Sequence, residues 1–439
     1  MTTAGSDKTF QIQAGGKLTG EIRVPGDKSI SHRSIMLGAL AEGTTQVSGF
    51  LSGEDNLATL NAFRDMGVEI EGPTDGRVTI KGVGLHGLKP PAKELYLGNS
   101  GTSMRLLAGL MAAQKFDSVL TGDESLSTRP MRRVTDPLAT MGAVVNTTDA
   151  GTPPLRITGN QNLNGISYDM PVASAQVKSC LLLAGLYAEG QTCVTEPAPT
   201  RDHTERMLQG FGYPIERKGA TACVKAGGKL AATQIDVPAD ISSATFFMVG
   251  ACIAPDSDIT LQHVGINPTR IGVINILKMM GARLDVTNER DVGGEPVADI
   301  RVQSSELKGI QIPEDQVPLA IDEFPALFVA AACAKGETVL TGARELRVKE
   351  SDRIQVMADG LQILGIDARP TNDGMVIQGG QLGTGTVASH GDHRIAMSFA
   401  MAGLRANGPI TITNCANVET SFPGFVELAS VAGLVIQAS

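Results

Sequence analysis

The sequence lacks the features of membrane-spanning, secreted and disulfide-rich proteins. No stretch reaches the roughly 18 consecutive apolar residues of a membrane span, and the N-terminal MTTAGSDKTFQIQ has neither the basic nor the apolar region of a signal peptide. The six cysteines form no CxxC pair, so we expect reduced core residues and neither a zinc site nor a compact disulfide framework. They are Cys180, Cys193, Cys223, Cys252, Cys333 and Cys415. A cytoplasmic protein without a membrane partner is predicted.

An excess of positive charge is also absent. The formal net charge is -9, and the isoelectric point is near 5.3. This acidity argues against a general nucleic-acid-binding or anionic-membrane surface, so no nucleic-acid partner is expected. Any site for an anion must therefore be a local concentration of lysine and arginine.

Motifs of nucleotide, metal and acyl-transfer chemistry are missing or incomplete. There is no Walker A sequence and no GxSxG nucleophile elbow. Gly82, Gly84 and Gly87 have the spacing of a dinucleotide fingerprint, but a lysine and two prolines follow where a helix should begin. His390 and His393 have no evident third partner for a metal ion. We therefore expect neither a cofactor nor a metal.

A repeated motif is present instead, in a chain whose 439 residues are enough for two domains of roughly 200 residues each. A glycine before a short strand-like run recurs at intervals of roughly 70 residues. Its copies are DMGVEI (Gly67), TMGAVV (Gly142), GFGYPI (Gly212), MMGARL (Gly281), ILGIDA (Gly365) and VAGLVI (Gly433).

A second motif keeps the same order along the chain: a polar start, about a dozen small apolar residues and a turn into a strand. Small residues all round this helix indicate that it is buried and closely approached. The six units, each with two helices and several strands, fit two domains of three, with a boundary before Ala239 and about twenty N-terminal residues pairing elsewhere. The alternative is chance likeness among alanine- and glycine-rich helices. The copies begin at Gly26, Gly98, Val172, Ala239, Asp322 and Gly391.

Lysine and arginine cluster at the predicted helix starts, where the helix dipole favours anions and disfavours cations. Their position predicts bound anions, and the arginine fork suits carboxylate and phosphate groups. If the buried helices of each domain run side by side, two such faces would form a cleft for multiply charged ligands. These cations are Lys28, Arg33, Arg129, Arg132, Arg133, Arg201, Arg270, Lys349, Arg353 and Arg394. The alternative is local pairing with the neighbouring Asp27, Asp202, Asp352 and Asp392.

Five short segments, in order along the chain, carry a resemblance to a known family. They are PGDKSISHR (25–33), LGNSGTSMRLL (97–107), STRPMRRV (127–134), RVKESDR (347–353) and GDHRIAM (391–397). They resemble the signatures of the 3-phosphoshikimate 1-carboxyvinyltransferase (EPSP synthase) family. The resemblance implies an α/β (α+β) fold of two domains, each of three βαβαββ repeats with buried central helices in an inside-out α/β barrel, and a cleft between the domains. The first domain would span 24–238, and the second would comprise 1–23 and 239–439.

The family's reaction adds the 5-hydroxyl of shikimate 3-phosphate to C2 of phosphoenolpyruvate while C3 gains a proton, and then eliminates phosphate. It needs a base, an acid and a clamp for several negative charges. The resemblance implies contacts to shikimate 3-phosphate from Lys28, Ser29, Arg33, Ser174, Ala175, Gln176, Arg201, Asp322 and Lys349. It implies contacts to phosphoenolpyruvate from Lys28, Gly101, Arg129, Gln176, Arg353 and Arg394.

Three residues would carry the proton transfers. Asp322 would accept the hydroxyl proton, Glu350 would deliver or shuttle the proton at C3, and Lys28 could protonate the departing phosphate. Both carboxylates have a structural alternative, because Asp322 could cap the following helix and Glu350 could pair with Arg353. Whether Glu350 or Lys28 handles the C3 proton stays open.

Departures from the family pattern look like its second class. Thr420 stands where many members have lysine, Glu345 and Leu346 stand where many have Asn-Trp, and Ala175 replaces the second serine of a pair. Some members of that class tolerate glyphosate, which is a possible inhibitor here. Tolerance stays open, because position 101 is glycine and not the alanine of a well-known tolerant form.

Two other functions are less well supported. UDP-N-acetylglucosamine enolpyruvyl transferase shares the fold and phosphoenolpyruvate, but it uses a loop cysteine and Lys-Asn near its N-terminus. Here Ser29 follows Lys28, and no cysteine lies between Gly101 and Cys180. A non-catalytic repeat scaffold, such as a nucleic-acid clamp, would need a basic inner surface and no acid or base. We expect a monomer that binds the two small-molecule substrates.

Overall fold

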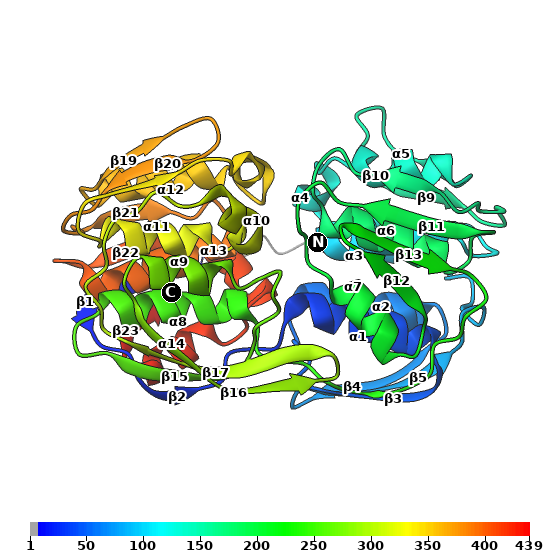
Figure 1. Ribbon diagram of the computed structural model, residues 1–439, viewed down its shortest axis with the longest axis horizontal. Helices are drawn as coiled ribbons and strands as arrows, with labels where there is room; N and C mark the ends of the chain where they lie inside the picture. Colours follow the sequence, from blue (N-terminus) through cyan, green and yellow to red (C-terminus); the bar gives the residue numbers. More distant parts are fainter. Residues whose placement is uncertain (1–7) are drawn as a thin grey trace. The chain divides into compact units, whose positions relative to one another are not determined.

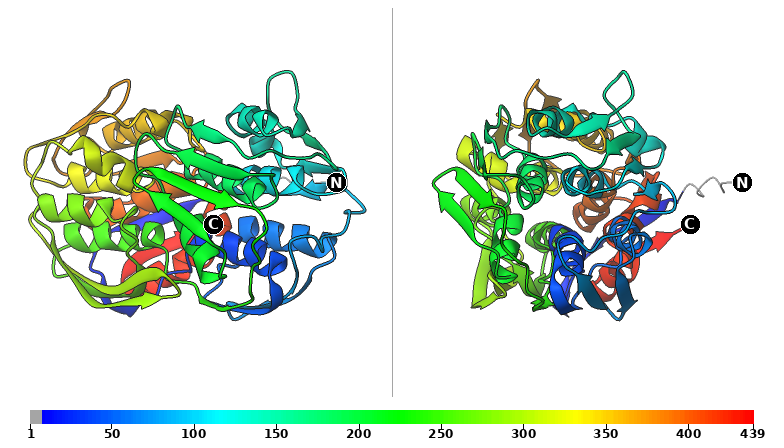
Figure 2. Two further views of the ribbon diagram at one scale, coloured as in Figure 1. Left: turned by 45° about the vertical axis from the view of Figure 1, so that its right-hand side comes forward. Right: turned by 90° about the vertical axis from the view of Figure 1, so that its right-hand side faces the viewer.

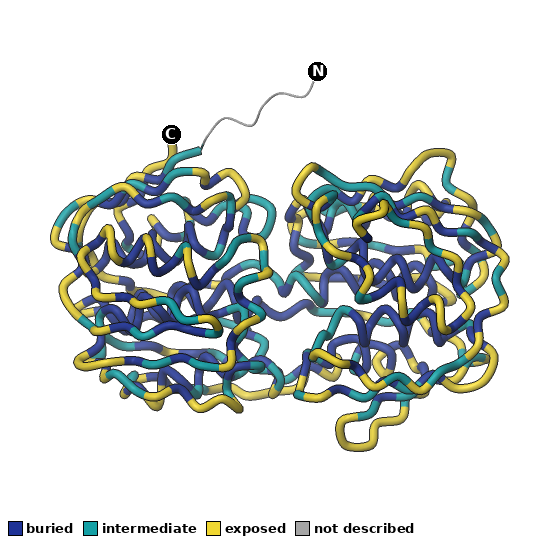
Figure 3. Tube along the Cα trace, turned by 90° about the horizontal axis from the view of Figure 1, so that it is seen from above, coloured by how far each residue is buried: buried dark blue, intermediate teal, exposed yellow. Residues whose placement is uncertain are grey.

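The computed structural model describes residues 8–439, in which two compact units can be distinguished (Figure 1). Unit 1 comprises Met1–Pro25, Pro238–Asp291 and Pro296–Ser439, and unit 2 comprises Gly26–Val237 and Val292–Glu295. Each unit has its own cluster of buried apolar side chains, which lies along the dark blue segments of Figure 3. The predicted mixed α/β fold with two domains is confirmed.

Each copy of the second sequence motif forms a buried helix. In unit 1 these helices pack against one another, and in unit 2 α3 packs against α6. The small residues permit this approach: a Cβ on Gly109 of α3 would lie 2.1 Å from the carbonyl oxygen of Cys180 in α6. The buried helices are α1 (Lys28–Leu40), α3 (Gly101–Ala112), α6 (Ala175–Gly185), α8 (Ile241–Ile253), α11 (Phe324–Ala332) and α13 (His393–Ala402).

Each copy of the glycine motif follows a second helix and turns the chain into a strand. All six repeat glycines have positive φ, from 76° at Gly212 to 120° at Gly433, a conformation that glycine adopts most readily after a helix. No helix in residues 8–439 has both the length and the hydrophobicity needed to cross a bilayer. These second helices are α2 (Glu54–Asp65), α5 (Arg132–Thr140), α7 (His203–Gly210), α9 (Gly272–Met279), α12 (Arg353–Ile363) and α14 (Phe425–Ala432).

The strands of unit 2 form three sheets. The first has the order β14 (Gln234–Asp236), β3 (Glu42–Ser48), β5 (Arg77–Val83) and β4 (Glu69–Thr74). The second has the order β6 (Leu95–Tyr96), β7 (Ser118–Thr121), β9 (Leu155–Thr158) and β8 (Val144–Asn146). The third has the order β10 (Ser167–Asp169), β11 (Gln191–Thr195), β13 (Thr221–Lys225) and β12 (Ile215–Lys218).

The strands assigned mainly to unit 1 form three further sheets. One has the order β16 (Arg283–Val292), β17 (Glu295–Gln303), β15 (Asp258–Gly265) and β2 (Thr19–Ile22). The next has only β18 (Glu337–Leu340), β20 (Met375–Gln378) and β19 (Asp367–Pro370). The last has the order β21 (Gly385–Ala388), β22 (Ile410–Thr413), β1 (Phe10–Gly16) and β23 (Leu434–Ala438).

The sheets share one pattern of strand directions; Figures 1 and 2 show their strands and helices from several sides. In each four-stranded sheet one edge strand runs parallel to its neighbour. In the three-stranded sheet, isolated parallel bridges such as Gln311↔Val339 take the place of that edge strand. All of these sheets, which account for the strands in residues 8–439, are open. Each unit therefore has three separate open sheets beside its buried helices.

Shorter helical segments lie between the longer helices and strands. They are α4 (Glu124–Ser127), α10 (Val317–Ala320) and the 3-10 turns η1 (Glu314–Gln316), η2 (Arg344–Val348), η3 (Gly403–Arg405) and η4 (Ala416–Thr420).

The expectation that all cysteines are reduced core residues is wrong for two of them. Cys193 on β11 lies directly opposite Cys223 on β13, and the two form a disulfide. Antiparallel pairing of strands 30 residues apart brings them together, which their spacing in the sequence does not reveal. Cys180 and Cys252 are buried free thiols, and burial raises the pKa of each to about 12.

Candidate active site

In unit 2, Lys28 and Ser29 form the first turn of α1. Asp27 caps this helix, because its carboxylate accepts the backbone N–H of Ile30 at 2.8 Å. The ammonium group of Lys28 pairs with the carboxylate of Asp55 on α2, and 25% of the Lys28 side chain is exposed. The predicted cation is therefore present at the helix start, and it has a local carboxylate partner.

Arg33 lies one turn further along α1 and is buried. Its Nε donates to the hydroxyl of Thr204 at 2.7 Å, and its Nη2 donates to Ser179 at 2.8 Å. Its Nη1 donates to the backbone carbonyl of Ser29 at 3.0 Å. The pKa of Arg33 is lowered to about 10, mainly by burial; the charge of Arg201 also lowers it, whereas the charges of Glu205, Asp27 and Glu295 raise it. The two predicted arginines are therefore electrostatically coupled. Arg33 stays charged at neutral pH, in a surrounding rich in hydroxyl groups.

The start of α6 holds three predicted residues. Ser174 is its N-cap and accepts the N–H of Val177 at 3.3 Å, and Ala175 is its first helical residue. Gln176 follows, and its Nε2 donates to Thr102 of α3 at 3.0 Å. Ser174, Ala175 and Gln176 therefore lie at a helix N-terminus, as the sequence predicted.

Gln176 has a partner that the sequence reasoning did not single out. Nη1 of Arg105, on α3, donates to Oε1 of Gln176 at 2.7 Å. Arg105 is nearly buried, and it lies within the LGNSGTSMRLL segment that carried the resemblance. The motif that contains Arg105 could be recognised in the sequence, but its contact with Gln176 across α3 and α6 could not.

Gly101 begins α3 and lies against two guanidinium groups. A Cβ built there would be 3.0 Å from Nη1 of Arg105 and 3.1 Å from Nη1 of Arg129. Arg129 is held in turn by Asn99, which accepts its Nη2 at 2.7 Å. Gly101, Arg129 and Gln176 are therefore brought together in unit 2.

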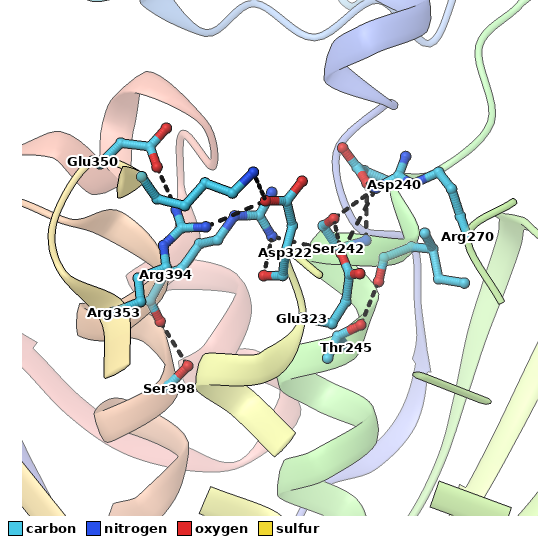
Figure 4. A network of polar contacts seen from close by, with 12 residues as sticks. Asp240, Ser242, Thr245, Arg270, Asp322, Glu323, Glu350, Arg353, Arg394 and Ser398 are labelled. Atoms are coloured by element: carbon cyan, nitrogen blue, oxygen red, sulfur yellow. Dashed lines mark hydrogen bonds and ion pairs between the residues drawn. The ribbon is translucent and has the colours of Figure 1, made fainter. Parts of the chain in front are cut away.

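In unit 1, Arg353 lies among three carboxylates, of which Figure 4 labels Glu350 and Asp322. Its Nε donates to Asp392 at 2.8 Å, its Nη2 to Glu350 at 2.6 Å and its Nη1 to Asp322 at 3.3 Å. Burial alone would lower the pKa of this buried guanidinium, but the charges of Asp392, Glu350 and Asp322 outweigh burial and raise it. Arg353 is a permanent cation that joins α12 to the start of α13.

Asp322 contacts three other predicted residues of unit 1, Lys349, Arg353 and Arg394. Its carboxylate lies 3.5 Å from Nζ of Lys349, and Arg353 also donates to it. Nη1 of Arg394 donates to its backbone carbonyl at 3.1 Å. The structural alternative for Asp322 is not seen, because the N-cap of α11 is Glu323 and no side chain caps that helix. The alternative for Glu350 is seen, since it pairs with Arg353.

The comparisons with known proteins agree along nearly the whole chain. The model of the family described as EPSP synthase (3-phosphoshikimate 1-carboxyvinyltransferase) matches residues 12–428. The chain belongs to the EPSP synthase family. A protein of Methylococcus capsulatus named 3-phosphoshikimate 1-carboxyvinyltransferase is 71% identical over 433 residues, which cover 99% of both chains. A similarly named protein of Nitrosococcus oceani is 70% identical over 428 residues, covering 98% of this chain and 96% of the relative.

Solved structures of other proteins share this fold. EPSP synthase from Acinetobacter baumannii superposes with a TM-score of 0.91 at 65% identity, covering 98% of this chain and 100% of that one. The enolpyruvyl transferase NikO from Streptomyces tendae superposes with a TM-score of 0.75 at 17% identity, covering 99% of each chain, which shows a common fold alone. The resemblance carried by the five segments is therefore confirmed.

Proposed function

We propose that this chain transfers the enolpyruvyl group of phosphoenolpyruvate to the 5-hydroxyl of shikimate 3-phosphate, giving 5-enolpyruvylshikimate 3-phosphate and phosphate. The observation that carries this function is membership of the EPSP synthase family over residues 12–428, with 71% identity to a relative named for the reaction. The chain is accordingly a transferase of the shikimate pathway, which serves aromatic amino-acid biosynthesis.

Unit 2 would supply most of the charge that holds shikimate 3-phosphate. Lys28, Arg33 and Arg201 would face its phosphate and carboxylate, and Ser29, Ser174, Ala175 and Gln176 would add polar contacts. Arg33 supports this role, because its partners are hydroxyl groups and a carbonyl, which leave its charge without a directly bonded carboxylate. An anion that reaches Arg33 could accept charge-assisted hydrogen bonds from a fixed guanidinium, although the charges of Glu205, Asp27 and Glu295 also act on this group.

The proposed contacts of phosphoenolpyruvate are mostly cationic side chains. In unit 2 these groups are Lys28, Arg129, Gln176 and the backbone at Gly101, where a side chain would crowd the guanidinium groups. In unit 1 they are Arg353 and Arg394. The fork of arginine can bind the carboxylate or phosphate of this substrate through two parallel hydrogen bonds.

Unit 1 would supply the proton transfers, with Asp322 as the base. Its contact with Lys349 supports this role, because Asp322 is an acceptor beside a residue proposed to contact the shikimate ring. As the 5-oxygen forms its bond to C2 of phosphoenolpyruvate, Asp322 would take the hydroxyl proton while C3 gains one. In the second step the C2–oxygen bond to phosphate breaks and C3 loses a proton.

Glu350 and Lys28 would serve the remaining proton transfers. Glu350 would deliver the proton at C3 and take one back, and Lys28 would protonate the departing phosphate. Glu350 is 32% exposed at its side chain and keeps one oxygen on Arg353, so it can exchange protons with water while held in place. Comparing Glu350→Gln with Lys28→Met for exchange of the C3 hydrogens with solvent deuterium would assign the C3 proton.

Release of phosphate tests the proposed function directly. The purified chain is mixed with phosphoenolpyruvate and either shikimate 3-phosphate or UDP-N-acetylglucosamine, and phosphate is measured over time. We expect release with shikimate 3-phosphate and none with the nucleotide sugar. Absence of release with shikimate 3-phosphate would overturn the proposal, and release with the nucleotide sugar alone would assign the other enolpyruvyl transfer.

Three further properties belong to this proposal. We propose that the chain works as a monomer, which sedimentation equilibrium tests. We propose that it works in the cytoplasm, which fractionation of the source cells tests. Glyphosate is proposed to compete with phosphoenolpyruvate, because an anion of that kind would use the same arginines; inhibition that is independent of phosphoenolpyruvate concentration would contradict this.

A further inference from the structure

Glu323 is a buried carboxylate for which the proposed reaction has no direct use. Only 3% of the residue is exposed, and it occupies the N-cap position of α11 without accepting a capping hydrogen bond. Its Oε1 accepts the hydroxyl of Ser242 on α8. The same oxygen lies 3.7 Å from Nη1 of Arg394 on α13 and 3.9 Å from Nη2 of Arg270 (Figure 4). One carboxylate therefore connects the three buried helices of unit 1.

Arg270 and Ser242 hold this carboxylate from the side away from Arg394. Nη2 of Arg270 donates to Ser242 at 2.6 Å and to Asp240, the cap of α8, at 2.9 Å. Arg270 is itself only 3% exposed. A buried carboxylate is costly unless cations and hydrogen bonds offset its lost hydration, and here both are present. Glu323 therefore has little freedom to move.

Arg394 differs from its neighbour Arg353 in how its guanidinium is used. All three nitrogens of Arg353 donate to carboxylates. In the described part of the chain, the polar contacts of the Arg394 guanidinium are both made by Nη1, to the carbonyl of Asp322 and to Glu323. Its Nε and Nη2 are therefore available to an anion, and 14% of its side chain is exposed. The contacts at Nη1 fix the direction in which this fork points.

We propose that Glu323 is a positioning residue that holds Arg394 ready for the anionic groups of phosphoenolpyruvate. This inference rests on the proposed function, because Arg394 is taken as a contact of that substrate. Ser242 and Arg270 fix Glu323, and Glu323 fixes Arg394. Glu323 also follows Asp322 directly in the chain, so the same carboxylate steadies the peptide whose carbonyl accepts from Arg394.

The test replaces Glu323 by glutamine in the full-length chain. Glu323→Gln keeps the size of the side chain and an oxygen for Ser242, but it removes the charge that faces Arg394. Displacement of a binding group by about 1 Å can cost about 100-fold, so we expect the KM for phosphoenolpyruvate to rise roughly 10- to 100-fold. The KM for shikimate 3-phosphate should change by less than about threefold, because most of its proposed contacts lie in unit 2.

Glu337→Gln is the matched control, because Glu337 is another carboxylate of unit 1 whose partner, Arg369, lies on an exposed surface. It should leave both KM values unchanged. A purely structural role for Glu323 would lower the melting temperature and the fraction of active enzyme without changing the KM for phosphoenolpyruvate, and that result overturns the inference. An inactive unmodified chain would instead contradict the proposed function.

Ser242→Ala provides a second route if Glu323→Gln does not fold. Loss of this hydroxyl removes one hydrogen bond from Glu323 and one from Arg270, while every charge is kept. We expect a smaller rise in the KM for phosphoenolpyruvate, of about threefold or more, because one hydrogen bond contributes about 1 kcal/mol. When both variants fold, the double variant should lose less than the product of the single effects, since both act on Arg394. An unchanged KM in Ser242→Ala, or fully multiplicative effects, would overturn the inference.

Discussion

Arg33 of unit 2 and Arg353 of unit 1 are both buried, but they differ in the groups to which they donate hydrogen bonds. Arg33 in unit 2 donates to two hydroxyls and a carbonyl, and burial lowers its pKa to about 10. Arg353 in unit 1 donates to three carboxylates, whose charges outweigh burial and raise its pKa. A buried cation without a bonded carboxylate favours an incoming anion, whereas one among carboxylates keeps those carboxylates in place. Arg33 therefore fits the proposed contact with an anion, and Arg353 keeps the proposed base Asp322 in place.

The largest effect on activity is expected from the replacement of Asp322, in unit 1, by alanine. Without the proposed base, we expect turnover to fall by roughly 100-fold or more, as is typical of general acid-base groups, while shikimate 3-phosphate still binds. Steady-state phosphate release and equilibrium titration of shikimate 3-phosphate measure the two quantities. Asp315→Ala, at an exposed carboxylate of unit 1, is the control. Retained turnover in Asp322→Ala would remove Asp322 as the base.

Replacement of Arg33 by lysine tests the side of unit 2. Lysine keeps the charge but cannot donate to Thr204, Ser179 and the Ser29 carbonyl together, so its position would no longer be fixed. Loss of charge-assisted hydrogen bonds costs about 1.5 to 3 kcal/mol, so the Kd for shikimate 3-phosphate should rise roughly 10- to 100-fold. Calorimetric titration measures it, with the exposed Arg64→Lys of α2 as control. An unchanged Kd would show that Arg33 is only a structural cation.

The parts of these surroundings that the sequence predicted are local in the chain. The six repeat glycines mark positions where each helix must turn into a strand, and their positive φ follows from neighbouring residues alone. The cations at helix starts could be predicted for the same reason, because a helix start is recognised from neighbouring residues. Arg353 begins α12 and Glu350 lies three residues before it, and the two form the pairing that their spacing indicated.

The parts that were missed depend on contacts between distant segments. Glu323 and Ser242 are 81 residues apart, and Arg105 and Gln176 are 71 apart. Such pairs form only when buried helices of different repeats pack together, and helix periodicity does not fix that register. The disulfide between Cys193 and Cys223 was missed in the same way, because it depends on the pairing of β11 with β13.

A methyl group at position 101 tests whether the positions of Arg105 and Arg129 in unit 2 matter for binding phosphoenolpyruvate. In Gly101→Ala the new Cβ would lie 3.0 Å from Arg105 and 3.1 Å from Arg129, so both flexible guanidinium groups must shift by a few tenths of an ångström. We expect the KM for phosphoenolpyruvate to rise by roughly three- to tenfold, less than for the other variants, because no charge is lost. Gly210→Ala, where the new Cβ has only ordinary contacts, is the control. An unchanged KM would mean that these arginines tolerate the displacement or do not bind the substrate.

The smallest expected effect is on stability, and it concerns His32 beside the cations of unit 2. Burial lowers the pKa of His32 well below its usual value, and the charges of Lys28 and Arg33 lower it further. The folded state therefore leaves His32 neutral while the unfolded state binds a proton below pH ~6.5, so its contribution to stability is lost as the pH falls.

At pH ~5.5 this difference should cost about 1.4 kcal/mol of unfolding free energy relative to pH ~8. His32→Gln, which keeps a polar group for Thr59, should remove that part of the pH dependence. Urea unfolding of both proteins at the two pH values measures it, and His86→Gln, at a histidine outside the buried core, is the control. An equal loss of stability in the wild-type and His32→Gln proteins would show that burial and the charges of Lys28 and Arg33 do not keep His32 neutral in the folded state.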